Sequence, residues 1–347
     1  MKKVGILGLP GAGKSTLFEI LMQGAGASPA GAARDRVGVV RVPDGRVDRL
    51  SALFTPRRTV HTQIQFVDSA AAGQARPGRG TDLFAGLRTC DMLVAVVRDF
   101  ENPAVPAAGG VDPDRDLREL GAELALNDLA IAETRLERVD KELKVGRRDH
   151  EREAAVLRRC RAALEAGQPL RELAFEAEEE RLLRGFQWLT ARPLLVVYNQ
   201  DDRSTREPPA PGPGARAVRL RALTEREIVT LPEAERAAFR AGLGVAEDGL
   251  SLVIRACYEL LGLIAFFTVG PDEVRAWTLG RGGSAVDAAG EIHTDLARGF
   301  IRAEVVPCDR LLELGGLAKA RERGALRLEG RDYRVQDGDC LEIRHNA

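Results

Sequence analysis

The sequence predicts an α/β protein with a partly parallel sheet, an inserted helical segment and a smaller α+β domain at its C-terminal end. Short apolar runs alternate with helical patterns through most of the first 262 residues, which is typical of strands joined by crossover helices. A charged stretch from residue 112 to residue 184 interrupts them and shows no strand pattern. After residue 262 several strand patterns surround one helical pattern. We therefore expect three architectural parts in this chain of 347 residues.

The first strand is predicted over residues 2–9, an apolar run that ends in a glycine-rich turn. A helix is expected to begin just after this turn, near Lys14 or Ser15. Residues 206–214 are rich in proline and glycine and are predicted to form a loop. Further strands of the same sheet are predicted over residues 37–42, 62–67, 92–97, 194–198 and 217–220.

The inserted segment is predicted to form a helical hairpin. Leu129, Leu136 and Leu143 recur every seven residues, and after a turn signal at Gly146 apolar residues again follow a helical spacing. Two antiparallel helices packed as a coiled coil account for this pattern. The other faces carry many arginine and glutamate side chains, which are ordinarily solvated. The alternative is that they form a docking arm for an acidic partner such as RNA.

The C-terminal region has the pattern of a separate α+β domain of about 80 residues, which is within the usual range of domain sizes. Its predicted strands cover residues 264–269, 274–279, 300–306, 333–335 and 341–344, with one helix over residues 285–297. We therefore predict an α/β domain of residues 1–111 and 185–262, a helical arm of residues 112–184 and a C-terminal domain of residues 263–347.

Composition narrows the classes of function. The chain carries 51 Lys and Arg against 52 Asp and Glu, so its bulk charge gives no sign of DNA or membrane binding, although a local basic face remains open. No apolar run approaches the roughly 18 residues of a membrane span, and the start shows no signal-peptide pattern. The five cysteines are scattered without a CxxC pair, which disfavours structural zinc and disulfides and fits a reducing cytoplasm.

The strongest chemical signal is the segment Gly8-Leu-Pro-Gly-Ala-Gly-Lys-Ser15, a full match to the phosphate-binding pattern G-x-x-x-x-G-K-[ST]. It lies between a predicted strand and a predicted helix, which is the context that this motif requires. The glycines let backbone N–H groups approach the β-phosphate, and the helix N-terminus adds partial positive charge. Lys14 is expected to bridge the β- and γ-phosphates as the catalytic side chain, Ser15 to hold Mg²⁺, and Thr16 to reach the α-phosphate. The predicted nucleotide-binding residues of this loop are Gly8, Gly11, Ala12, Gly13, Lys14, Ser15 and Thr16.

Two further strand ends carry polar residues. Asp68 ends an apolar strand, where P-loop NTPases place an Asp that holds Mg²⁺ directly or through water. The alternative is that this carboxylate only caps a turn.

Asn199 and Asp202 follow another strand with the Asn-x-x-Asp spacing of a GTPase base-reading pair. In such a pair the Asn holds neighbouring loops and the purine N7 edge, while the Asp accepts from guanine N1 and N2. An ordinary polar turn has the same residue types. We therefore predict that Ser15 and Asp68 hold Mg²⁺ and that Asn199 and Asp202 contact the base.

Beyond these motifs, the chain resembles the YchF (Obg-like ATPase) family of P-loop NTPases over nearly its whole length. The segments that carry the resemblance are GLPGAGKSTLF (8–18), GVVRVPDGRVDRL (38–50), FVD (66–68), VVRDFENP (96–103), ELALNDL (123–129), YELLGLIAFFTVGPDEVRAWTL (258–279), AAGEIHTDLARGFIRAEVV (288–306) and LEGRDYRVQDGD (328–339). They come from three architecturally different parts of the chain, which makes the match specific.

The resemblance implies that the inserted helices form the family's coiled-coil arm and that residues 263–347 form its TGS domain, a ubiquitin-like β-grasp module. It implies a cytoplasmic, Mg²⁺-dependent NTPase that associates with the ribosome, in particular its large subunit, or with another RNA–protein partner. Family members often prefer ATP to GTP, a preference linked to an Asn-x-x-Glu motif without the Lys of ordinary GTPases. Here Gln200 takes the Lys position and Asp202 keeps a carboxylate that is one methylene shorter. ATP is therefore the favoured ligand, with GTP close behind.

Two switch segments depart from the family pattern. The family's first switch carries a Thr that contacts Mg²⁺ and the γ-phosphate, but Ser28 is the only hydroxyl residue in the corresponding loop, residues 24–36. The second switch should read Asp-x-x-Gly, and here its last position is Ala71. An alanine is unfavourable there if the backbone must adopt a conformation that only glycine reaches easily. Ala72 takes the place of the Gln that positions water in Ras-type enzymes, and the family itself has an apolar residue there.

Three functions remain open from the sequence. The favoured one is a slow NTPase that acts as a nucleotide-dependent switch, because phosphoryl transfer needs positioning and charge neutralisation more than covalent chemistry. The second is a degenerate protein that binds a nucleotide without hydrolysing it and serves as a ribosome or RNA–protein binding module. The third is a small-molecule kinase with the same loop, which leaves the C-terminal domain unexplained. Mg²⁺-dependent phosphate release that Lys14→Ala abolishes separates the first two.

Overall fold

The computed structural model describes residues 1–346 apart from residues 25–34, 70–83, 104, 105, 108, 148, 149, 205, 210 and 244–247. The chain divides into two compact units. The N-terminal unit comprises Met1–Val40 and Gln65–Leu260, and the C-terminal unit comprises Arg41–Ile64 and Leu261–Ala347. This division differs from the predicted domains in two respects. Residues 41–64 belong to the C-terminal unit, and the helical arm is part of the N-terminal unit.

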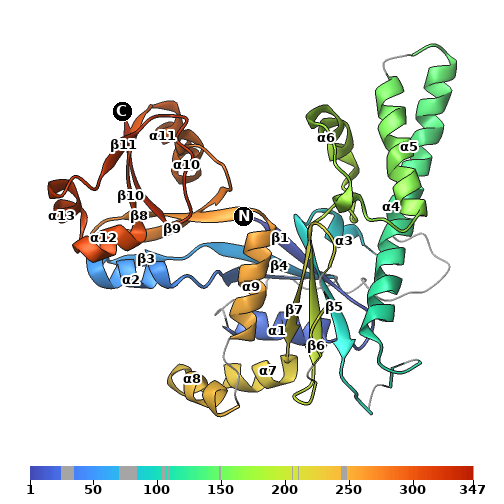
Figure 1. The fold of residues 1–347 in the computed structure, drawn as a ribbon, viewed down its shortest axis with the longest axis horizontal. Helices are drawn as coiled ribbons and strands as arrows, with labels where there is room; N and C mark the ends of the chain where they lie inside the picture. The colour runs from blue at the N-terminus through green and yellow to red at the C-terminus, as the bar shows by residue number, and fades with distance from the viewer. Residues whose placement is uncertain are drawn as a thin grey trace. The chain divides into compact units, whose positions relative to one another are not determined.

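The described part of the N-terminal unit centres on a sheet of six strands (Figure 1). The strands are β1 (Lys3–Leu7), β2 (Asp35–Arg41), β4 (Gln63–Ser69), β5 (Met92–Asp99), β6 (Leu194–Gln200) and β7 (Ala215–Leu220). Their order is β2-β4-β1-β5-β6-β7, and the pairs β1–β4, β1–β5, β5–β6 and β6–β7 are parallel. β6 is buried at all of its positions, as expected of a parallel strand covered on both faces. The prediction of a partly parallel sheet is thus confirmed.

Helices cover this sheet. On one side, α1 (Lys14–Gly24) contacts α7 (Ala222–Thr230), which is followed by α8 (Glu233–Gly242), and α9 (Gly249–Leu260) packs against β6 and β7. In β5, Leu93, Ala95 and Val97 share a core cluster with residues of α3 (Ala85–Arg88) and of the first part of the arm. The intervening residues of β5 are also buried, and side chains alternate between the two faces of a strand. Both faces of the sheet therefore lie in apolar surroundings.

The inserted segment is a helical hairpin, as predicted. It consists of α4 (Pro113–Lys144), α5 (Glu151–Glu165) and the shorter helices η2 (Leu170–Glu172), α6 (Ala177–Leu183) and η3 (Arg184–Phe186). α4 begins where Asp112 accepts a hydrogen bond from the Arg115 N–H, and it runs beside α5 (Figure 1). Leu136 of α4 and Leu157 and Cys160 of α5 belong to one buried apolar cluster, in which the two helices pack together. Within the described residues, no helix combines the length and the apolar character that crossing a membrane requires.

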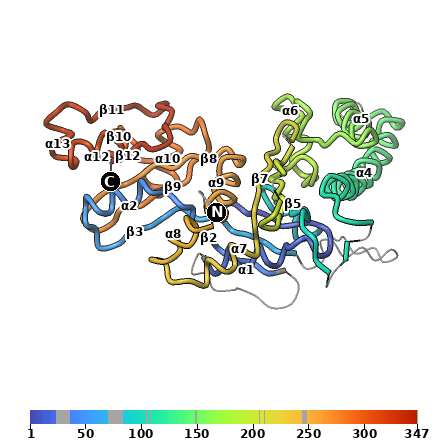
Figure 2. The backbone as a smooth tube through the Cα atoms, turned by 60° about the horizontal axis from the view of Figure 1, so that its bottom comes forward, coloured from blue at the N-terminus to red at the C-terminus, as the bar shows by residue number. Residues whose placement is uncertain are grey.

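The C-terminal unit contains a sheet with both parallel and antiparallel strand pairs, together with helices, which agrees with the predicted α+β domain. Figure 2 shows the course of its backbone. Its elements are α2 (Gly45–Phe54), β3 (Arg58–Val60), β8 (Leu263–Val269), β9 (Glu273–Gly280), α10 (Ala285–Ile292), α11 (Thr294–Arg298), β10 (Phe300–Pro307), α12 (Cys308–Leu314), α13 (Leu317–Glu322), β11 (Arg327–Glu329) and β12 (Asp339–His345). The strand order is β11-β10-β12-β8-β9-β3. The single helix predicted over residues 285–297 is in fact two, because His293 is extended and its Nδ1 accepts from the Asp295 N–H at the start of α11. The strand predicted over residues 333–335 is only an isolated bridge between Arg334 and Ser284.

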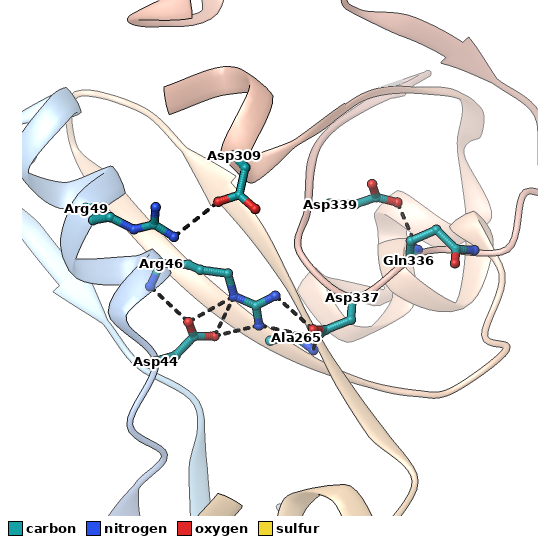
Figure 3. Close-up of polar contacts among 8 residues, drawn as sticks. All are labelled: Asp44, Arg46, Arg49, Ala265, Asp309, Gln336, Asp337 and Asp339. Atoms are coloured by element: carbon teal, nitrogen blue, oxygen red, sulfur yellow. Dashed lines mark hydrogen bonds and ion pairs between the residues drawn. The ribbon is translucent and has the colours of Figure 1, made fainter. Parts of the chain in front are cut away.

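Residues 41–64 join the C-terminal unit through backbone and side-chain contacts (Figure 3). β3 extends the sheet by pairing in parallel with β9. On α2, the Arg46 guanidinium lies between two carboxylates, with Nη2 donating to Asp44 at 2.8 Å and Nη1 donating to Asp337 at 2.8 Å. Asp337 also accepts from the Ala265 N–H at 2.8 Å, so that it connects α2 to β8. Because Val47 and Leu50 of α2 are fully buried in the core of this unit, the segment is an integral part of that fold.

Candidate functional site

The predicted phosphate-binding loop connects the end of β1 to the start of α1. Gly8, Gly11 and Gly13 all have positive φ angles, of 153°, 78° and 102°. A Cβ atom at Gly8 would lie 2.3 Å from the Val96 carbonyl oxygen of β5, so a side chain there would collide with the neighbouring backbone. The glycines are therefore required by the path of this loop, and the strand–loop–helix context expected of the motif is present.

Lys14 lies at the first turn of α1 with its side chain folded over the loop. Its Nζ donates to the carbonyl oxygens of Gly8 and Leu9 at 2.7 and 3.1 Å. Burial lowers the pKa of Lys14, while the nearby Asp68 carboxylate acts in the opposite direction. Ser15 is exposed beside it and Thr16 is half-buried. The cationic group and the two hydroxyl residues thus follow one another at the start of α1, directly after the loop.

Asn199 connects this loop to the end of β6. Its Nδ2 donates to the Ala12 carbonyl oxygen at 3.0 Å, and its Oδ1 accepts from the Ala222 N–H at 3.1 Å. The side chain is buried, and a Cβ atom at Gly13 would lie 2.3 Å from Asn199 Nδ2. The structure therefore brings Asn199 and the phosphate-binding loop together, although they are far apart in the sequence.

Asp202 and Gln200 have different surroundings from Asn199. Asp202 is exposed, and its Oδ1 accepts from Thr224 Oγ1 on α7 at 2.7 Å. Gln200 is buried, and its Nε2 donates to Asp99 Oδ2 and to the Arg206 carbonyl oxygen. Gln200 therefore links the end of β5 to the segment after β6, whereas Asp202 Oδ1 is shared between Thr224 and Arg221, whose Nε lies 3.9 Å away.

Asp68 lies on β4, in register with Ile6 of the neighbouring β1, and its side chain is buried. Its Oδ2 accepts from Nη2 and Nε of Arg36, at 2.5 and 3.1 Å. The sequence analysis missed Arg36, because an arginine at this position of β2 follows no spacing rule. The carboxylate of Asp68 already holds a cation, and carboxylate and hydroxyl oxygens are donors that Mg²⁺ accepts. Asp68 and Ser15 therefore fit a Mg²⁺ site that phosphate oxygens and water would complete.

Comparison with curated proteins finds relatives along the whole chain. The protein named "Ribosome-binding ATPase YchF" from Haemophilus ducreyi is 39% identical over 360 residues, which cover 99% of both chains. The protein of the same name from Bacillus subtilis is 38% identical over 362 residues, with the same coverage of both chains. The chain belongs to the YchF family.

Solved structures and a family profile agree with this membership. The structure of the Schizosaccharomyces pombe YchF GTPase is similar with a TM-score of 0.84 and 26% identity, covering 99% of this chain and 97% of that one. The profile YchF-GTPase_C, described as a protein of unknown function (DUF933), matches residues 263–346. That match begins at β8, so it covers most of the C-terminal unit of this YchF chain but leaves out residues 41–64.

The switch positions of the YchF pattern fall outside the described residues. Ser28 of the first switch lies there, and so do Ala71, Ala72 and the rest of the second switch beyond Ser69. The roles predicted for these positions, and the Mg²⁺ and base contacts of the other site residues, stay predictions. What the structure adds to them is the arrangement of Lys14, Asn199, Asp68 and Arg36 around one loop.

Proposed function

We propose that the chain binds ATP, or GTP, together with Mg²⁺, hydrolyses it slowly, and acts as a nucleotide-dependent switch that associates with the ribosome. The observation that carries this proposal is the glycine-dependent loop between β1 and α1, which Asn199 fixes from β6. The names of the relatives, "Ribosome-binding ATPase YchF" and "YchF GTPase", support both the nucleotide and the partner.

The loop supplies positioning and charge, which are what phosphoryl transfer chiefly needs. Backbone N–H groups of residues 8–15 and the N-terminus of α1 would receive the β-phosphate. Lys14 would leave the carbonyl oxygens of Gly8 and Leu9 to bridge the β- and γ-phosphates. Ser15 and Asp68 would hold Mg²⁺, which when bound neutralises charge on the phosphate oxygens. These groups support slow turnover without a dedicated general base.

The choice of base rests on Asn199 and Asp202. Asn199 is already occupied in holding the loop, so its contribution to affinity is the same for both purines. The exposed Asp202 carboxylate accepts from N1 and N2 of guanine or from the N6 amino group of adenine. We favour ATP because the curated relatives are named ATPases, and we expect measurable GTP binding because the carboxylate is retained.

A second candidate is a nucleotide-binding protein that does not hydrolyse. The observation in its favour is the ion pair between Asp68 and Arg36, which places a guanidinium on the predicted Mg²⁺ ligand. The first switch also offers only Ser28 in place of a Thr. In this case the arm and the C-terminal unit would carry the function on the ribosome.

Phosphate release from Mg·ATP and Mg·GTP, with and without ribosomes, distinguishes the two candidates. Lys14→Ala is the decisive variant, and Lys144→Ala, on the last turn of α4, is a charge-matched control. Turnover in the wild type and the control but not in Lys14→Ala supports an NTPase. Nucleotide binding without turnover in any sample supports the non-hydrolysing binder. Co-sedimentation with separated large and small ribosomal subunits tests the partner.

A further inference from the structure

Arg36 belongs to none of the sequence motifs, but its guanidinium contacts the candidate site. The guanidinium donates from both Nη2 and Nε to one oxygen, Asp68 Oδ2. It also lies over the ring of Phe18, 4.9 Å from the ring centroid, and its Nη1 donates to Glu19 Oε1 at 3.3 Å. Phe18 and Glu19 belong to α1, so Arg36 is held between β4 and the helix that begins at the phosphate-binding loop. The position of this cation is therefore fixed by three separate contacts.

The carboxylate of Asp68 needs a positive charge beside it. The residue is 5% exposed, and a buried carboxylate without a compensating charge or hydrogen bonds is strongly unfavourable. A guanidinium that donates two hydrogen bonds meets this need. A divalent cation that contacts the same carboxylate would meet it equally well. The two cations would then stand within about 4 Å of each other, where like charges repel.

We propose that Arg36 and Mg²⁺ compete for Asp68, so that Mg²⁺ loading requires the guanidinium to leave this carboxylate. This inference rests on the proposed function, since it concerns how the nucleotide site takes up its metal. Arg36 is also the last residue of the predicted first switch, residues 24–36, which lacks the Thr that contacts Mg²⁺ in the family pattern.

Binding of the fluorescent, non-hydrolysable analogue mant-AMPPNP to the full-length protein tests the competition. The dissociation constant is measured in EDTA and in excess Mg²⁺, and the ratio of the two values reports how much the metal strengthens binding. We expect this ratio to be at least about threefold larger in Arg36→Ala and in Arg36→Gln than in the wild type, since a competing charge is gone. Arg41→Ala removes the same charge from the exposed end of β2, where the described residues show no ion pair, and should leave the ratio unchanged.

The Asp68→Asn background shows whether the effect passes through this carboxylate. In this background, adding Arg36→Ala should leave the ratio unchanged, because the carboxylate for which Arg36 and Mg²⁺ compete is absent. A ratio that is unchanged or smaller in both Arg36 variants, with binding retained, overturns the competition and leaves the proposed function standing. A wild type that does not bind mant-AMPPNP at all contradicts the proposed function itself.

Discussion

Asn199 holds the phosphate-binding loop from the end of β6, with its Nδ2 donating to the Ala12 carbonyl oxygen at 3.0 Å. The Oδ1 of the same amide accepts from the Ala222 N–H at the start of α7. One buried side chain therefore connects the loop, the central sheet and a helix. This is the loop-holding role expected of Asn199, while its contact with a base stays a prediction.

Asn199→Ala should weaken both the fold and the site. The substitution leaves the Ala222 N–H and the Ala12 carbonyl without partners, and a buried polar group without its partner costs roughly 1–3 kcal/mol. We expect the free energy of unfolding to fall by about 2–4 kcal/mol and the affinities for ATP and GTP to fall together by about tenfold or more. Urea unfolding and fluorescent-nucleotide titration measure the two effects. A loss confined to one nucleotide would show instead that Asn199 acts on the base.

Gly13→Ala should abolish nucleotide binding while the fold persists. The φ angle of Gly13 is 102°, which an L side chain rarely adopts, and the added Cβ would lie 2.3 Å from Asn199 Nδ2. The loop must shift, so its N–H groups no longer converge on a phosphate. Gly121→Ala, on α4 with no atom within 4 Å of the added Cβ, is the matched control and should stabilise the helix by about 0.5–1 kcal/mol. Circular dichroism of both variants measures the fold, and nucleotide titration measures the affinity. An unchanged nucleotide affinity in Gly13→Ala would contradict the prediction.

Local sequence patterns predicted those parts of this fold whose contacts are close in the chain. The phosphate-binding loop follows from one strand, one turn and one helix, and the arm follows from apolar residues spaced by seven. The prediction of one continuous helix over residues 285–297 was wrong at one residue. The apolar pattern continues across His293, although the backbone there is extended. A histidine that receives a hydrogen bond at the start of a second helix gives no periodic signal.

The contacts that the sequence did not predict join distant segments. Arg58 of β3 pairs with Glu273 of β9, 215 residues later, and nothing local in residues 41–64 indicates that partner. The short β3 also has only three residues, too few for a pattern of alternation. In the candidate site, Asp68 was found because strand-end carboxylates are a known position for metal ligands. Its partner Arg36 was missed because a neighbouring strand supplies it.

Leu157→Ala should destabilise the arm without changing nucleotide affinity. Leu157 is fully buried between α4 and α5, and truncating a buried Leu costs about 2–5 kcal/mol. We expect a lower thermal midpoint and the same dissociation constant for mant-AMPPNP, since the helical hairpin does not contribute the loop residues. Leu126→Ala, on the same helical arm but 65% exposed, is the control and should change the free energy of unfolding by less than about 0.5 kcal/mol. Equal effects of the two substitutions would mean that the helices do not pack through this core.

Asp337→Asn should weaken the attachment of α2 in a pH-dependent manner (Figure 3). Burial raises the pKa of Asp337, but hydrogen bonds from the Arg46 guanidinium and the Ala265 N–H outweigh it, so the pKa lies below the ordinary value of an Asp. A carboxyl group with a lowered pKa stabilises the fold above its unfolded pKa, and this stabilisation is lost as the pH falls through the folded value. Because the side chain is 47% exposed, we expect a loss of about 1 kcal/mol at neutral pH.

The difference between wild type and Asp337→Asn should therefore be constant from about pH 7 down to about pH 5 and shrink below about pH 4. Urea unfolding of both proteins at several pH values measures it. Asp309→Asn provides the comparison. Asp309 of α12 pairs with Arg49, which lies on α2 like Arg46, but its side chain is 76% exposed, and an exposed ion pair contributes little to stability. Its effect should stay within about 0.5 kcal/mol at every pH. If Asp337→Asn behaves in the same way, or if its effect persists unchanged at about pH 3, then the contact between Arg46 and Asp337 does not hold α2 in place.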